Sequence, residues 1–171
     1  SALSSRPVRA VCLTRPRCAI VFPMPSMFDP TTRESLIRRI RALTPDAPRA
    51  WGRMTAPEMI AHLTDQMSHT LGDVSTTPIR DFRRWPGIKY LAIHVLPWPK
   101  GRVVGPPEAF VTKPADWTAD VNNLVALVER FGALDPNGRW ALHAIFGDMT
   151  GRDWGVFCHK HFDHHLRQFG Q

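Results

Sequence analysis

Four histidines lie within seven positions near the end of the chain, in the sequence HKHFDHHLRQFG at residues 159–170. Two of them, His161 and His165, are four residues apart, so on a helix they lie one turn above each other. Their imidazoles can then converge on one point, which is the spacing that helical metal sites use. A proton relay and a polar helix end are the other interpretations that clustered histidines allow.

The surroundings of this pair favour a metal over the other interpretations. Helical spacing places His161 and His165 on the face expected to enter the core, among Trp154, Phe162 and Phe169. A charged imidazolium would carry a desolvation cost there, whereas a neutral imidazole needs a partner. A divalent cation supplies one. Neutral rings are required for binding, so metal affinity is expected to fall below the ordinary histidine pKa of about 6.5.

A third metal ligand must come from another helix, and His62 in EMIAHLTDQM is the leading candidate. It lies on the flank of its helix, about 100° of arc from the centre of the apolar stripe. A structural histidine at a contact between helices is therefore an equally weighted interpretation. Asp65, His143 and Gln168 are candidates for outer groups that hydrogen-bond the free ring nitrogen of a ligand.

The other reactive side chains near the pair receive structural interpretations. His164 and His159 point away from the predicted metal side, so both are expected to face solvent or to hydrogen-bond their neighbours. Cys158 lies one turn before His161 and is expected to be a small hydrophobic residue of the core. No catalytic residue is assigned from the sequence.

Helix caps and apolar residues at helical spacing predict the elements that hold these residues. Four principal helices are predicted at residues 30–43, 55–71, 116–132 and 150–169, and an additional helix at residues 82–96. Residues 97–116 contain five prolines and two glycines and are expected to be an irregular connection. No clear strand is found, so the sequence predicts an all-α bundle.

The positive charge of the chain is concentrated near its beginning. The 171 residues carry a net charge of +7, but residues 1–28 hold four arginines and no acid, which leaves +3 for the rest. Nucleic acid is therefore disfavoured as a partner. No apolar stretch approaches the roughly 18 residues of a membrane-spanning helix, which disfavours a membrane partner as well.

The sequence divides into a basic N-terminal extension, residues 1–28, and a helical domain, residues 29–171. The extension is interpreted as upstream sequence before a start at Met24 or Met27, with a transit peptide as the alternative. It could rest on the neighbouring subunit of a homodimer. Deleting residues 1–26 is expected to leave a folded domain. The three cysteines lack C-x-x-C spacing, which favours a reducing, cytoplasmic location.

Two motifs of the sequence are similar to those of a known family. WGRMTAPEMIAHLTDQM, followed at a distance by HAIFGDMTGRDWGVFCHKHFDHHLRQFG, resembles the DinB-like superfamily, in particular an uncharacterised branch ending in H-x-x-H-H-L-R-Q-F. The resemblance covers residues 29–171. It implies an up-down four-helix bundle, here with an additional helix and a long Pro-rich loop. It also implies a divalent metal, zinc or nickel, held by His62, His161 and His165.

Three histidines leave a metal with open coordination positions, which is typical of catalytic sites rather than structural ones. Relatives in the superfamily include thiol-dependent S-transferases and a mycothiol-dependent isomerase. The resemblance therefore implies a metal-dependent enzyme whose small-molecule substrate is a low-molecular-weight thiol. A metal-dependent hydrolase and a non-enzymatic metal-binding module are the alternatives that the residues leave open.

Overall fold

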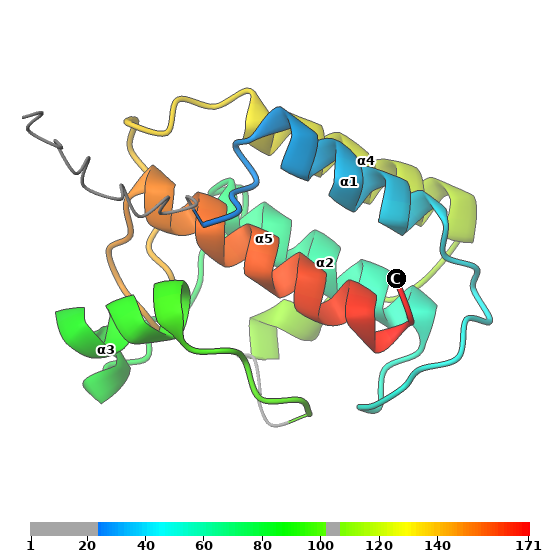
Figure 1. Ribbon diagram of the computed structural model, residues 1–171, viewed down its shortest axis with the longest axis horizontal. Coiled ribbons are helices and arrows are strands. Elements are labelled where there is room, and N and C mark those ends of the chain that lie inside the picture. The colour runs from blue at the N-terminus through cyan, green and yellow to red at the C-terminus, as the bar shows by residue number, and fades with distance from the viewer. Residues whose placement is uncertain (1–23, 102–106) are drawn as a thin grey trace, which may run out of the picture.

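The computed structural model describes residues 24–101 and 107–171, and every regular element in them is helical. In chain order these elements are α1 (Pro30–Arg41), α2 (Ala56–Thr70), η1 (Phe82–Arg84), α3 (Pro86–Tyr90), η2 (Leu91–Val95), η3 (Pro107–Phe110), α4 (Trp117–Gly132) and α5 (Gly151–Gln168) (Figure 1). The predicted all-α fold is confirmed. Within these ranges no helix has both the length and the hydrophobicity needed to cross a bilayer.

The four principal helices begin where the sequence predicts, because their N-terminal amides find side-chain acceptors. The Asp29 carboxylate accepts a hydrogen bond from the amide of Thr32 at the start of α1. The predicted capping boxes form at α2 and at α5, where Thr55 pairs with Glu58 and Thr150 with Asp153. Each helix ends within two residues of its predicted limits.

The four long helices pack so that α4 and α5 each lie beside both α1 and α2. Figure 1 shows α1 and α5 running in one direction and α2 and α4 in the other. An ion pair between Arg130, near the end of α4, and Asp73, just after α2, agrees with this direction. The four long helices therefore do not alternate strictly up and down, since α2 and α4 run in the same direction. The long connection from residue 71 to residue 116 allows this because it returns the chain to the end of the bundle at which α2 begins.

Apolar residues of all four long helices fill the space between them. The exposed fraction of each of these side chains is at most 1%: Leu36, Ile40, Ile60, Leu63, Met67, Leu124, Val128, Trp154 and Phe162. The stripes predicted from helical spacing thus meet in one core. Burying a large apolar side chain contributes about 1.5 to 3 kcal/mol, so this core holds α2 and α5 at a fixed separation.

The segment predicted as a single helix at residues 82–96 is broken into η1, α3 and η2. Pro86 begins a new helix because Trp85 before it has an extended backbone. The last turn, η2, is a π-helix, and the ammonium group of Lys160 on α5 donates to the carbonyl oxygens of Ala92, Ile93 and Leu96. The segment is therefore fixed against α5 by a side chain that the helical pattern did not single out.

Residues 24–28, assigned above to the extension, are described by the structure, and the last three belong to the fold. Met27 is fully buried, and its amide donates to the carbonyl oxygen of Gly155 on α5 at 2.9 Å. The Phe28 ring lies 4.5 Å from the ring of Phe131 on α4. Met27 and Phe28 therefore contact the helical domain. Residues 1–23 lie outside the described part of the chain.

Met27 is therefore expected to contribute strongly to stability. Replacing Met27 by alanine should lower the free energy of unfolding by about 2 to 5 kcal/mol, because it leaves a cavity in the hydrophobic core. Met24→Ala is the matched control, since the Met24 side chain is 47% exposed. Urea denaturation measures the free energy of unfolding of both variants. An equal effect of the two substitutions would show that Met27 does not contribute to the core.

Candidate metal centre

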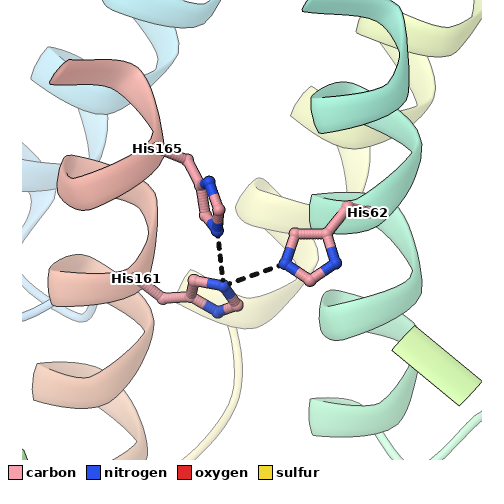
Figure 2. Close-up of side chains that lie close together, drawn as sticks. All are labelled: His62, His161 and His165. Atoms are coloured by element: carbon pink, nitrogen blue, oxygen red, sulfur yellow. Dashed lines mark hydrogen bonds between the residues drawn. The ribbon is translucent and has the colours of Figure 1, made fainter. Parts of the chain in front are cut away.

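The structure brings His62, His161 and His165 together at the contact between α2 and α5, as Figure 2 shows. The Nε2 atom of His161 lies 3.1 Å from Nε2 of His62 and 3.0 Å from Nε2 of His165. All three residues are buried, with exposed fractions of 5 to 9%. The predicted convergence of these residues from two helices is confirmed.

The ring of His62 is held in place by η3, a short 3-10 helix within residues 97–116, which were predicted to lack regular structure. Its Nδ1 donates to the carbonyl oxygen of Ala109 at 2.8 Å, and the ring of Phe110 stacks on it at 4.7 Å. Both residues belong to η3. A carbonyl partner on Nδ1 is typical of metal-ligating histidines, because it fixes the ring and leaves Nε2 with its lone pair.

His165 is held in the same way by a side chain. Its Nδ1 donates to Oε1 of Gln168 at 3.1 Å, and the amide nitrogen of Gln168 donates to the carbonyl oxygen of Trp51 at 2.6 Å. The second bond fixes which end of the Gln168 amide faces the histidine. Gly52 allows this approach, since a Cβ there would lie 2.3 Å from the Gln168 nitrogen, and its φ of +80° also favours glycine.

These partners leave too few protons between the rings. The Nε2 atoms of His62 and His165 carry lone pairs, because the proton of each neutral ring is on Nδ1. Both lone pairs face Nε2 of His161, which can donate at most one proton. One proton cannot serve both acceptors, so at least one of the two short contacts has no hydrogen bond unless a cation lies between the rings. The donor set and its geometry fit a divalent metal ion.

The electrostatics keep the three rings neutral. Burial lowers the pKa of His165 to about 3, with His62 as a further cause, and burial lowers the pKa of His161 well below its ordinary value. Burial also lowers the pKa of His62, partly offset by the hydrogen bond to Ala109 and by the charge of Asp65. Neutral imidazoles are the forms that bind a metal.

Of the three predicted outer groups, only Gln168 contacts a ligand ring directly. Asp65 lies one step further out, where its carboxylate accepts from the amides of Val111 and Thr112 at 2.9 and 3.0 Å. It thereby holds the loop whose carbonyl fixes His62. His143 does not hydrogen-bond any of the three ligand rings. Its Nδ1 instead accepts hydrogen bonds from two backbone amides of its own turn.

The expectation that His164 faces solvent is wrong in part. It is half-buried, and its ring lies 6.1 Å from that of Trp51 and 6.2 Å from that of Trp98. Both tryptophans come from loops, so helical spacing could not reveal them. Cys158 is fully buried, as expected, and burial raises the pKa of its thiol to about 12. A thiol held neutral in this way fits a core residue.

Two cavities meet at this centre. The larger has a volume of about 410 Å³ and touches all three histidines as well as His164. The smaller, of about 270 Å³, reaches only His62 among them. A substrate in either cavity would lie beside at least one of the three rings, so the centre is accessible to small molecules.

Comparison with known proteins gives a family without an assigned activity. A family model described as "Protein of unknown function (DUF1569)" matches residues 33–171. These residues include all three histidines of the centre and every helix from α2 onward. No curated protein and no solved structure shows significant similarity to the chain.

Proposed function

The chain belongs to the DUF1569 family, and we propose that it is a metal-dependent enzyme that activates a low-molecular-weight thiol for transfer to an electrophile. The metal is a divalent ion, zinc or nickel, held by His62, His161 and His165. One observation carries the proposal. Because Ala109 and Gln168 hold the Nδ1 protons of His62 and His165, the Nε2 lone pairs of both rings face His161.

A divalent ion with open coordination positions would lower the pKa of a thiol or a water molecule bound to it. In the proposed reaction the thiol loses its proton to solvent, and its sulfur forms a bond to an electrophilic carbon. The bond from that carbon to its leaving group breaks, and the leaving group departs with the electron pair. The chain's own residues orient the reactants and exclude water.

The surroundings favour a thiol over water as the nucleophile. Hydrolysis commonly uses a carboxylate or histidine as general base, and because the nearby acids described by the structure are engaged, His164 in the wall of the larger cavity is the candidate for that role. Asp65 holds Val111 and Thr112, and Glu58 completes the cap of α2. A thiol needs less help, because its ordinary pKa of about 8.5 is far below that of water.

The DinB-like resemblance is part of the same proposal. We propose that α1, α2, α4 and α5 form a DinB-like four-helix bundle, with the η1–α3–η2 segment as an addition. The histidines support it, because one comes from the second long helix and two come from the last. The equal direction of α2 and α4 requires the long connection between them.

The reaction class is tested with zinc-loaded protein, glutathione or cysteine as the thiol, and 1-chloro-2,4-dinitrobenzene as the electrophile. Metal-dependent formation of the thioether is expected, with a loss of at least about 100-fold in His165→Ala. Hydrolysis of 4-nitrophenyl acetate by the same samples is the parallel assay. Metal-dependent ester hydrolysis without thioether formation would replace the transferase by the hydrolase.

Gln168 gives a prediction about metal affinity without touching the metal. Gln168→Met removes the acceptor of the His165 Nδ1 proton at similar volume and should weaken zinc binding by about 10- to 100-fold. Competition with a chelator of known affinity measures it. Unchanged affinity in a variant of unchanged helicity would mean that His165 needs no partner to bind.

A further inference from the structure

The larger cavity beside the three histidines is mainly apolar. Its volume of about 410 Å³ lies in the range of small-molecule sites. Its apolar walls come from the end of the broken segment, from η3, from α5 and from the connecting loops, and include Leu96, Trp98, Phe110, Phe146 and Phe157. The rings of Trp98 and Phe157 lie 5.5 and 5.7 Å from the ring of His161, so the apolar wall continues up to the metal centre.

Among the residues that the structure describes, no unpaired charge lines this cavity. Arg83 is the one ordinarily charged residue among its described lining residues, and its guanidinium donates to Oδ2 of Asp81 at 2.9 and 2.6 Å and to Oδ1 at 3.1 Å. His143, also in the wall, is neutral because burial lowers its pKa to about 3. A charged ligand body would lose its hydration here without gaining a partner.

The smaller cavity differs in its chemistry. Arg53, Glu58 and Lys113 line it, and His62 is the one histidine of the centre that it reaches. Charged groups of a reactant would therefore find partners in the smaller cavity. This division leaves the larger cavity for a reactant without charge.

One polar atom points to a ligand. Nδ1 of His161 is buried and has no hydrogen-bond partner within the described part of the protein. When Nε2 of this ring binds a metal, Nδ1 carries the proton and requires an acceptor. His161 lines the larger cavity, so we assign the missing acceptor to a molecule bound there.

We infer that the larger cavity binds the electrophile of the thiol transfer, a neutral molecule with an aromatic or aliphatic body and one hydrogen-bond acceptor. The inference rests on the proposed function for the role of this molecule as electrophile. Binding of the apolar body depends on the cavity walls alone. The acceptor depends on the proton that a bound metal leaves on His161.

Ethylbenzene is the probe for the apolar body, titrated by calorimetry into the protein as purified and after treatment with a chelator. Leu96→Glu places a carboxylate in the wall and should weaken binding at least tenfold. Val95→Glu is the matched control, because the two side chains are 51% and 55% exposed and only Leu96 lines the cavity. Equal binding by the two variants, or no binding by the unmodified protein, would overturn the inference.

Two ligands of similar size complete the test. Benzoate should bind the chelator-treated protein at least tenfold more weakly than ethylbenzene. Equal affinity would contradict the inference that the ligand of this cavity is neutral. Acetophenone should bind the zinc-loaded protein about tenfold more tightly than ethylbenzene. Equal affinity would contradict the inference that the ligand carries an acceptor for Nδ1 of His161. The ethylbenzene arm needs no metal. Ethylbenzene binding by a protein without zinc affinity would refute the proposed function and leave the cavity assignment intact.

Discussion

Replacing His161 or His165 by alanine is expected to lower the affinity for zinc by at least about 100-fold, and His62→Ala should do the same. Each substitution removes one of the three imidazole nitrogens proposed to bind the metal, which approach one another from α2 and α5. The remaining two cannot hold the ion against water and chelators. Equilibrium dialysis against a zinc buffer, with metal content measured by mass spectrometry, gives the affinities.

His164→Ala is the matched control. The residue is adjacent to His165 in sequence and its ring lies 5.3 Å from that of His165, but it is not a member of the converging group. Its substitution should leave most of the zinc in place. Circular dichroism of each variant excludes loss of the fold. If His164→Ala loses as much zinc as His165→Ala, the assignment of the ligands is wrong.

The second large effect concerns acid. Burial lowers the pKa of both His143 and His165 to about 3 in the folded protein, whereas unfolded histidines titrate near 6.5. The unfolded state therefore binds more protons between these two values. The free energy of unfolding of the metal-free protein should fall as the pH falls through this window, by roughly 1 kcal/mol per pH unit for each histidine.

Urea denaturation between pH 7 and pH 4 measures this slope. His143→Asn keeps an acceptor for the amides of Ile145 and Phe146 and removes one titrating group, so its slope should be shallower by about one proton. A slope equal to that of the unmodified protein would contradict the neutral, buried state of His143. The residue lies outside the metal centre, so the outcome does not depend on the ion.

The same burial changes the acid dependence expected from the sequence. An unperturbed histidine site loses its metal below a pH of about 6.5. Here protons compete for His165 only near a pKa of about 3 while the protein stays folded. Zinc should therefore be retained below pH 6 and leave together with the fold. Release near pH 6.5 from a folded protein would show that the rings are accessible to protons.

The sequence predicted the long helices and the three histidines well, because both depend on local rules. Caps at Asp29, Thr55 and Thr150 are set by side chains within three residues. The spacing of His161 and His165 is fixed by the helix itself. His62 was found only as a candidate on the flank of its helix.

What the sequence could not predict comes from backbone groups and from loops. The carbonyl oxygens of Ala109 and Trp51 orient His62 directly and His165 through Gln168, and no side-chain pattern encodes a carbonyl. Trp98 closes the cavity from a Pro-rich connection whose path depends on the whole fold. The single helix predicted at residues 82–96 failed because Pro86 restarts the backbone and Lys160 stabilises a π-turn.

The most direct test of the metal centre is a crystal structure of the zinc-soaked protein with anomalous diffraction measured on both sides of the zinc absorption edge. The proposed metal centre predicts one strong peak at about 2.0 to 2.1 Å from Nε2 of His62, His161 and His165. The hydrogen bonds of Nδ1 to Ala109 and Gln168 should be retained. No peak between the three rings, or a peak at other residues, would contradict it.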